Sequence, residues 1–289
     1  MSSTRFPPPI PPLNAATLLR QYGLRADKRL GQNFLQDPYA LERIVHAAEI
    51  RPTDTVLEIG PGLGSLTRYL AAATHKVVAV ELDDRLFAPL EAVIAPYRNI
   101  DLVHADILEI QPNEIIDQQD YLVVANIPYY ITSALIRHLL ESDPKPRRIV
   151  LTIQKEVAER ICAGPGDLSL LALSVQVYGQ PHIAAQIPAS AFFPAPKVDS
   201  SVLVVDISPS PQVDEKILDI FFQLIKAGFS QKRKKLRNSI SAGMCQTPGD
   251  AEKLLHAADI DPQRRAETLS LEEWGKLSYQ YFVNANLTK

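Results

Sequence analysis

The stretch VLEIGPGLGSLTRYL, Val56–Leu70, decides the fold of this chain. A short apolar run passes through a glycine-rich turn into a segment whose apolar residues have helical spacing, as in the first unit of a parallel α/β sheet. The glycines of the turn are Gly60, Gly62 and Gly64. Glycine lets the backbone approach a ligand closely, and the helix start offers free N–H groups. A dinucleotide fingerprint would place its third glycine at position 65, which is Ser65, so a nicotinamide cofactor is not indicated.

Strand and helix patterns alternate on both sides of this turn. We expect strands at 55–59, 76–82, 100–104, 121–125 and 148–153, and helices at 37–49, 65–73, 83–95 and 132–141. Such alternation predicts a doubly wound α/β fold with a parallel sheet that helices cover on both faces. Two later β-rich segments, 182–187 and 200–207, predict an antiparallel addition to the sheet.

Three regions follow from these patterns. Residues 1–27 form a proline-rich tail with a short helix at 14–22, and residues 28–207 form the α/β domain. The Ser-Pro repeat of residues 208–211 is the candidate linker. Beyond it, apolar residues recur at helical spacing, so residues 208–289 are expected to form a small all-helical domain.

Composition excludes several classes of protein. The 289 residues are 46% hydrophobic and carry a formal charge of -3, which fits a globular protein without a uniformly basic coat. The two cysteines, Cys162 and Cys245, are far apart and no histidines cluster, so neither a disulfide framework nor a metal site is indicated. No apolar run has the length of a membrane span. Prolines replace a signal peptide's apolar core, and although an acid-free N-terminus leaves organelle targeting open, we expect a cytoplasmic protein.

Two acidic residues follow successive strands of the predicted sheet. Glu81 ends the strand after the glycine turn, where its carboxylate can accept both hydroxyls of a ribose. Asp106 follows the next strand and is placed to meet an adenine edge. An isolated acid at a strand end is more often a loop residue or a helix cap. Because both acids share an edge with the glycine turn, the sequence predicts a nucleoside ligand there.

A second unusual stretch is VVANIPYYITSAL, Val123–Leu135, in which a buried strand ends on Asn126, Ile127, Pro128 and Tyr129. This cluster could be a turn that closes the strand. Its chemistry suggests more, because the N6 amine of adenine is a poor nucleophile whose lone pair is delocalised into the ring. The side-chain oxygen of Asn126 and the carbonyl of Ile127 could accept both N6 hydrogens, and Tyr129 could stack on the base.

The chain resembles a known family in KRLGQNFL, LEIGPGLGSLT, VVAVELD, ADIL, NIPYYITS, FFPAPKVDSSV and FSQKRKKLRNSI, which occur in this order from Lys28 to Ile240. It is similar to the bacterial small-subunit ribosomal RNA adenine N6-dimethyltransferases of the KsgA type. The resemblance implies a Rossmann-like class I methyltransferase domain and S-adenosylmethionine as methyl donor. The implied target is two adjacent adenosines near the 3′ end of small-subunit (16S) rRNA, in an immature 30S subunit.

The resemblance also assigns roles to individual residues. It places Asn33, Leu35, Gly60, Glu81, Asp106 and Asn126 around the cofactor, and Gly62 of the glycine turn joins them. The catalytic set is Asn126, Ile127, Pro128 and Tyr129, with Phe192 as the aromatic that covers the target adenine. Phe193 is expected to serve packing. Ile127 and Tyr130 depart from the family's usual leucine and asparagine, but neither change removes a hydrogen-bond acceptor.

A run of basic residues lies in the C-terminal region. Lys232, Arg233, Lys234, Lys235 and Arg237 come without an acid between them. A solvated helix face is the usual explanation of such a run, but in a suspected RNA-binding protein we expect contacts to rRNA phosphates.

Two rival functions stay open at this point. One is a large-subunit rRNA adenine methyltransferase that confers antibiotic resistance, and the other is a mainly non-catalytic rRNA-binding factor in assembly or transcription. We expect a monomeric enzyme that needs neither a metal nor a covalent nucleophile, since positioning and the two acceptors supply the catalysis.

Overall fold

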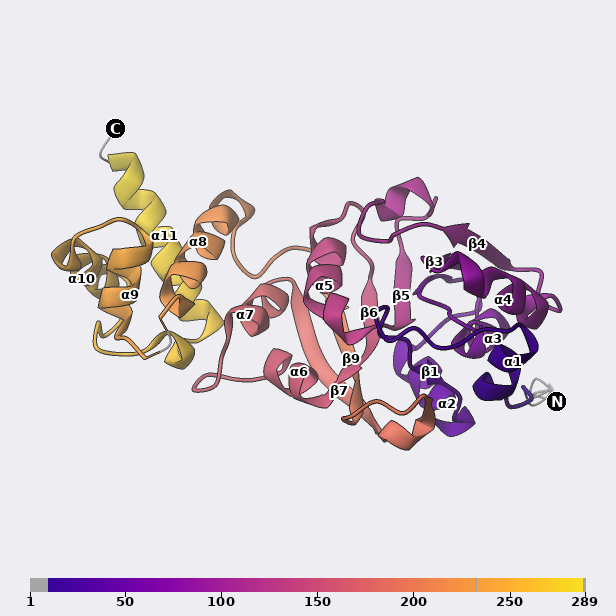
Figure 1. Cartoon of the computed structure of the whole chain (residues 1–289). Coiled ribbons are helices and arrows are strands. Elements are labelled where there is room, and N and C mark those ends of the chain that lie inside the picture. Colours follow the sequence, from indigo (N-terminus) through magenta and orange to yellow (C-terminus); the bar gives the residue numbers. More distant parts are fainter. Residues whose placement is uncertain (1–9, 232, 288–289) are drawn as a thin grey trace, which may run out of the picture. The chain divides into compact units, whose positions relative to one another are not determined.

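The computed structural model describes residues 10–231 and 233–287 of the chain (Figure 1). The chain divides into two compact units. The first unit extends to Ala158 and resumes over His182–Ile207, and the second comprises Glu159–Pro181 and the chain from Ser208 onward. Residues 159–181, which lie within the expected α/β domain, therefore belong to the second unit. Within the described ranges no helix is both long and apolar enough to span a membrane.

The first unit is built on a seven-stranded sheet in the order β4-β3-β2-β5-β6-β9-β7. The strands are β2 (Thr55–Ile59), β3 (Lys76–Glu81), β4 (Ile100–His104), β5 (Tyr121–Asn126), β6 (Arg148–Gln154), β7 (Gly179–Ile187) and β9 (Ser200–Ile207). Strands β2 to β6 pair in parallel, and β9 is antiparallel to β6. The doubly wound α/β fold is confirmed. Its strand order reverses between β2 and β5, which is where folds of this class bind ligands.

Helices cover both faces of the sheet. The unit contains α1 (Ala15–Gln21), α2 (Pro38–Ala48), α3 (Ser65–Ala73), α4 (Phe87–Ile94) and α5 (Thr132–Glu141). Helices α2 and α3 pack on the face that carries Val56, Val77 and Val124. All five residues of β2 are buried, which requires cover on the opposite face as well, because neighbouring side chains point to opposite sides.

Capping side chains set the helix boundaries. Asp37 caps α2 by accepting from the Ala40 N–H at 2.8 Å, and Pro38 occupies the first helical position. A single helix predicted from residue 83 is instead a 3-10 turn, Asp84–Leu86, followed by α4. The reason is that Asp83 caps the short turn by accepting from the Arg85 N–H.

The second unit is helical. It contains α7 (Leu170–Gln176), α8 (Leu218–Phe229), α9 (Leu236–Gly243), α10 (Pro248–Ala257) and α11 (Leu271–Leu287), and α6 (Lys155–Ile161) begins before its first residue. The fully buried Trp274 of α11 packs against Gly228 of α8, where a Cβ atom would collide with the indole ring. Helices α6 and α7 were not predicted from the sequence.

A separate two-stranded ribbon joins distant parts of the first unit. Strand β1 (Phe34–Leu35) pairs antiparallel with β8 (Phe192–Phe193), so that Phe34 lies opposite Phe193 and Leu35 opposite Phe192. The ribbon brings the segment before α2 next to the FFPAPKVDS loop.

Candidate active site

A cavity of about 230 Å³ opens where the strand order reverses. The residues expected to meet cofactor or target base all line it, namely Asn33, Leu35, Gly60, Gly62, Glu81, Asp106, Asn126, Ile127, Pro128, Tyr129 and Phe192. They come from six separate parts of the chain. Four parts lie at the ends of the parallel strands β2, β3, β4 and β5, whose carboxyl ends meet at one edge of the sheet, and the other two, with Asn33, Leu35 and Phe192, lie at the β1–β8 ribbon.

The glycine turn after β2 has a left-handed backbone at Gly60 (φ +68°) and Gly62 (φ +59°). A Cβ atom at Gly62 would also lie 3.1 Å from two ring carbons of Phe34. Both positions therefore favour glycine, one through its backbone conformation alone and the other also through close packing. The turn is held to the next strand by the Gly60 N–H, which donates to the Val80 carbonyl at 2.9 Å.

Glu81 is buried at the end of β3 and holds the surrounding turns through both carboxylate oxygens. Its Oε2 accepts from the Gly62 N–H at 2.9 Å, and its Oε1 accepts from the N–H groups of Leu82 and Asp83 at 3.0 and 2.9 Å. Burial raises the pKa of Glu81 above its ordinary value, although the three backbone donors oppose the shift. The carboxylate is thus preorganised as an acceptor inside the cavity.

Asp106 lies beyond the end of β4 and is half-buried. Its Oδ1 accepts from the Leu108 N–H at 2.9 Å, which fixes the side chain at the wall of the cavity.

Asn126 ends β5 and contacts the segment before β1. Its Nδ2 donates to the main-chain carbonyl of Asn33 at 3.2 Å. Because that bond occupies the donor side of the amide, Oδ1 remains as the acceptor. The next residue, Ile127, has a buried side chain, so only its backbone can serve a ligand. These two acceptors, Asn126 Oδ1 and the Ile127 carbonyl oxygen, are the ones that the mechanism expected from the sequence requires.

The tyrosine pair after Pro128 divides into an anchored and an exposed residue. The Tyr129 hydroxyl hydrogen-bonds to Ser200 Oγ at 2.8 Å, and burial raises the pKa of Tyr129. Tyr130 is 62% exposed. Ser200, at the first position of β9, thus orients the ring of Tyr129. The sequence patterns did not single out Ser200, although it belongs to the quoted FFPAPKVDSSV motif.

Phe192 is buried, with 4% of its surface exposed, and packs in the core while also lining the cavity. Phe193 is less buried and packs against the cluster around Phe34. Phe192 therefore forms part of the cavity wall, whereas Phe193 serves packing in this structure.

Glu58 is a cavity residue that was not predicted from the sequence. It lies in β2 with 1% of its surface exposed, and its Oε2 has no hydrogen-bond partner among the residues that the structure describes. Burial, reinforced by the nearby Glu81 carboxyl, raises the pKa of Glu58 to about 8. A charged residue within an otherwise apolar strand was the signal that could have revealed it.

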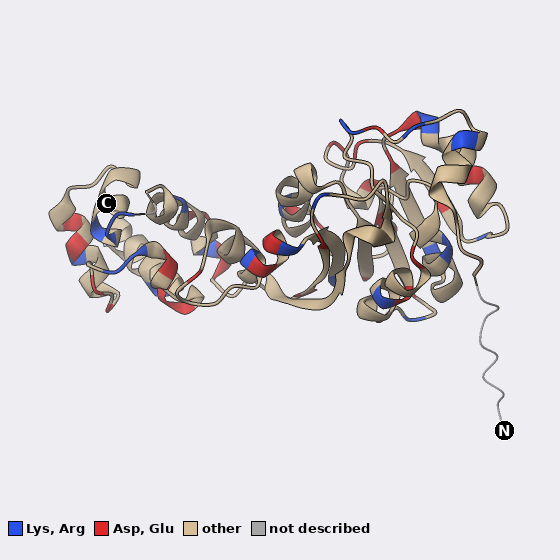
Figure 2. Cartoon of the chain, turned by 60° about the horizontal axis from the view of Figure 1, so that its bottom comes forward, with Lys and Arg blue, Asp and Glu red and all other residues tan. Residues whose placement is uncertain are grey.

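Two members of the basic run in the second unit interact with other side chains. Its members Arg233, Lys234 and Lys235 lie in the connection between α8 and α9 rather than on a helix, and Lys232 lies outside the described residues. In the ribbon of the helical unit, basic and acidic segments both occur (Figure 2). Lys235 donates to Gln263, and Arg237 pairs with Glu252 at 3.0 Å.

Arg233 and Lys234 are exposed and form no ion pair within the described ranges. They are therefore the members of the run best placed to meet a phosphate.

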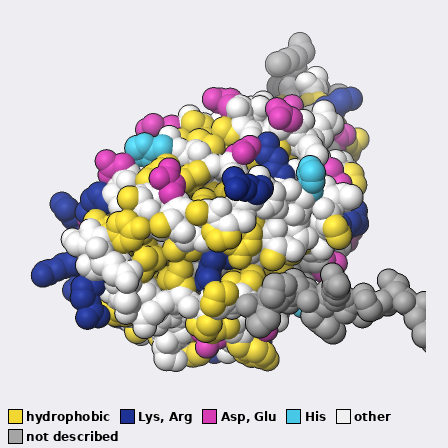
Figure 3. All heavy atoms as spheres, turned by 90° about the vertical axis from the view of Figure 1, so that its right-hand side faces the viewer, with side chains coloured by type: hydrophobic (Ala, Val, Ile, Leu, Met, Phe, Trp, Pro, Cys, Tyr) yellow, Lys and Arg dark blue, Asp and Glu magenta, His cyan; other side chains and the backbone are white. Residues whose placement is uncertain are grey.

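On the face that lies at the right of Figure 1, hydrophobic side chains gather toward the middle, and basic and acidic side chains both occur around them (Figure 3).

Comparisons with known proteins identify the family of this chain. The family model described as ribosomal RNA adenine dimethylase matches residues 23–281. Ribosomal RNA small subunit methyltransferase A of Dehalococcoides mccartyi (strain CBDB1) is 46% identical over 93% of each chain. The protein of the same name from Alkaliphilus metalliredigens is 40% identical over 93% of this chain and 96% of its own.

Two solved structures share the fold over most of their length. A dimethyladenosine transferase from Plasmodium falciparum has a TM-score of 0.75 and 27% identity, covering 87% of this chain and 98% of its own. The 23S rRNA methyltransferase ErmE has a TM-score of 0.70 and 28% identity, covering 86% and 99%. The resemblance drawn from the motifs is confirmed, and the chain belongs to the ribosomal RNA adenine dimethylase family.

Proposed function

We propose that the protein dimethylates N6 of two adjacent adenosines near the 3′ end of small-subunit rRNA, within an immature 30S subunit, using S-adenosylmethionine. The observation that carries this proposal is the meeting of Glu81, Asp106 and the Asn126–Tyr129 segment in one cavity at the point where the strand order reverses. Family membership and the small-subunit names of relatives at 40 to 46% identity support the choice of substrate.

The residues of the cavity fit S-adenosylmethionine. Glu81 offers a preorganised carboxylate suited to two ribose hydroxyls, held by the Gly62 N–H, and the missing side chain of Gly62 leaves room for the Phe34 ring beside the cavity. Glu58, whose Oε2 has no hydrogen-bond partner among the described residues, adds a second buried carboxyl to the same cavity. When bound, S-adenosylmethionine supplies an electrophilic methyl group. Asn33, Leu35, Gly60 and Asp106 complete the proposed cofactor site.

The catalytic step rests on the acceptors of the Asn126–Tyr129 segment. Asn126 Oδ1 and the Ile127 carbonyl accept the two N6 hydrogens, which turns the lone pair of N6 out of conjugation with the ring. Pro128 holds the turn, Tyr129 stacks on the extruded base with its ring fixed by Ser200, and Phe192 forms the wall behind the base. The proton released from N6 passes to water, because an N-alkylated ammonium of adenine is strongly acidic.

The helical unit is proposed to hold the rRNA. Arg233 and Lys234 are the exposed cations of its basic connection, and Lys232, Lys235 and Arg237 complete the run. We further propose that the protein acts as a cytoplasmic monomer.

The test is methyl transfer from labelled S-adenosylmethionine to undermethylated small subunits and, separately, to large subunits, followed by mapping of N6-dimethyladenosine. The proposal expects label on two adjacent adenosines of small-subunit rRNA and none with Asn126→Ala. Label on large-subunit rRNA would instead favour an activity like that of ErmE, and binding to small subunits without any label would favour a non-catalytic role.

A further inference from the structure

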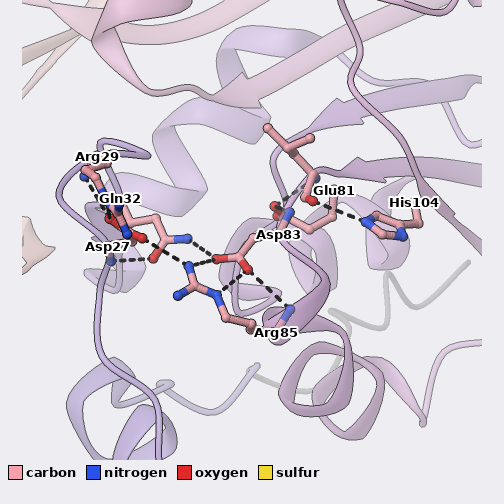
Figure 4. A network of polar contacts seen from close by, with 8 residues as sticks. Asp27, Arg29, Gln32, Glu81, Asp83, Arg85 and His104 are labelled. Carbon is pink, nitrogen blue, oxygen red and sulfur yellow. Dashed lines mark hydrogen bonds and ion pairs between the residues drawn. The ribbon is translucent and has the colours of Figure 1, made fainter.

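The segment of residues 27–35, here called the entry segment, is tied to the end of β3 by a polar network (Figure 4). Gln32 is at its centre. Its Nε2 donates to Asp83 Oδ2 at 2.7 Å, and its Oε1 accepts from the Asp27 N–H at 2.8 Å. The Gln32 amide therefore links two residues within the entry segment and also joins the segment to Asp83 after β3.

Asp83 is a firm anchor for Gln32. It is buried, and its two carboxylate oxygens accept from Arg85 Nε and Nη2, each at 2.7 Å. The hydrogen bonds from Arg85 hold the pKa of Asp83 below its ordinary value. Arg85 also reaches Asp27 Oδ2 at 3.3 Å, so both ends of the Gln32 bridge are held by the same guanidinium. Charge-assisted bonds of this kind are stronger than neutral ones.

The network continues into the cavity on the β3 side. The Asp83 N–H donates to Glu81 Oε1 at 2.9 Å. Asp83 therefore links Gln32 to the carboxylate proposed to bind ribose through two hydrogen bonds. A displacement of Asp83 would therefore also release one of the donors that orient Glu81.

The other end of the entry segment reaches the catalytic loop. The Asn33 carbonyl, next to Gln32 in sequence, accepts from Asn126 Nδ2 at 3.2 Å. A Cβ atom at Gly31 would lie 3.1 Å from Pro128 Cβ, which shows how closely the two segments pack. The position of the entry segment thus decides which atom of the Asn126 amide faces the target base.

We propose that Gln32 is a positioning residue that couples the ribose end of the cavity to the catalytic amide of Asn126. Gln32 lines the cavity, but both ends of its amide are engaged by Asp27 and Asp83. In this scheme it therefore acts by fixing the position of the Asn33 carbonyl relative to Asp83, not by binding the methyl donor or the base. The inference rests on the proposed function and deepens it. Its consequence is that cofactor affinity and the rate of methyl transfer fall together when the Gln32–Asp83 bond is broken.

The decisive variant is Gln32→Glu, which sets two carboxylates against each other. We expect about a tenfold weaker affinity for S-adenosylmethionine and about a tenfold lower single-turnover rate at saturating cofactor, since small displacements of reacting groups cost this much or more. The double variant Gln32→Glu/Asp83→Asn removes the repulsion between the two carboxylates but weakens the pairing of residue 83 with Arg85, so partial recovery is expected, with losses smaller than the sum of those of the two single variants. Gln32→Ala adds no charge and should change both quantities in the same direction by about threefold.

The matched control is Gln36→Glu, which introduces the same charge just beyond the entry segment, where the Gln36 side chain accepts from the Ala15 N–H at 3.3 Å. It should leave both quantities unchanged. Calorimetric binding of S-adenosylmethionine provides a readout apart from activity. A residue that served only stability would lower the unfolding temperature without changing the affinity of the folded variant for S-adenosylmethionine.

Equal affinity and rate in Gln32→Glu and wild type would overturn the inference while the proposed function stood, and so would additive losses in the double variant. A wild type that fails to bind S-adenosylmethionine would instead remove the proposed function, and the inference with it.

Discussion

Replacing Glu58 with glutamine should flatten the dependence of folding stability on pH. In the folded protein the pKa of this carboxyl is about 8, against an ordinary value of 4.5. Between these two values the folded state retains a proton that the unfolded state has released, so the free energy of unfolding falls as pH rises. The stability contributed by protonated Glu58 is complete below pH 4.5 and is lost as the pH passes through 8.

The full difference between the two pKa values corresponds to roughly 5 kcal/mol, an upper limit because water entry on ionisation relieves part of it. Glutamine keeps the shape of the protonated side chain but cannot ionise. The variant should therefore unfold at nearly the same denaturant concentration across this pH window. The remaining change of the unfolding free energy with pH would come from Glu81, whose pKa is also raised.

The assay is urea unfolding of wild type and Glu58→Gln at a series of pH values, with Glu91→Gln as the control on an exposed glutamate of α4. Parallel stability profiles for Glu58→Gln and wild type would refute the reasoning, because they would mean that Glu58 is ionised in the folded protein at neutral pH.

Four further changes test the site and the RNA-binding surface. Asn126→Ala should lower the single-turnover rate by on the order of 100-fold or more while S-adenosylmethionine affinity changes little, and a near-normal rate would exclude the two-acceptor mechanism. Glu81→Ala should weaken cofactor binding, measured calorimetrically in a folded variant, by about 1.5 to 3 kcal/mol. Phe192→Ala should lower the rate but not cofactor affinity, since stacking on a base is worth about 1 to 3 kcal/mol, although its burial makes a thermal unfolding control necessary. Replacing Arg233 and Lys234 with glutamine should reduce the slope of log affinity for small subunits against log salt by about 0.7 to 0.9 for each phosphate that the variant no longer neutralises, and an unchanged slope would place RNA binding elsewhere.

The elements nearest the cavity were predictable because local sequence determines them. Strand β2 and helix α3 have the predicted bounds, since a glycine turn separates a continuous apolar run from a helical pattern. Placing Glu81 and Asp106 at one edge needed only the rule that parallel strands share their carboxyl ends. The same rule brought Asn126 to that edge.

Interactions between distant loops were not predictable. The β1–β8 ribbon has two residues on each strand and pairs Phe34 with Phe193, so no run of residues marks it. The bond between Gln32 and Asp83 likewise joins two loops 51 residues apart. Helices α6 and α7 have seven residues each, so a period of 3.6 is weak in them, although α1 has the same length and was predicted. Each of these features depends on the tertiary fold, which single-sequence patterns do not contain.

The second unit is assembled from two separate segments of the chain, which affects the order in which it folds. Tyr178 stacks on Phe222 with ring centroids 6.2 Å apart, and the Gln212 N–H donates to the Val177 carbonyl at 2.8 Å. As the chain emerges during synthesis, residues 159–181 are complete before their partners beyond Ser208 exist. Strand β9, which lies between β6 and the edge strand β7 in the sheet, is synthesised after residue 181 and before residue 208. The sheet can thus close first, and α7 then finds its apolar partners only when α8 has been translated.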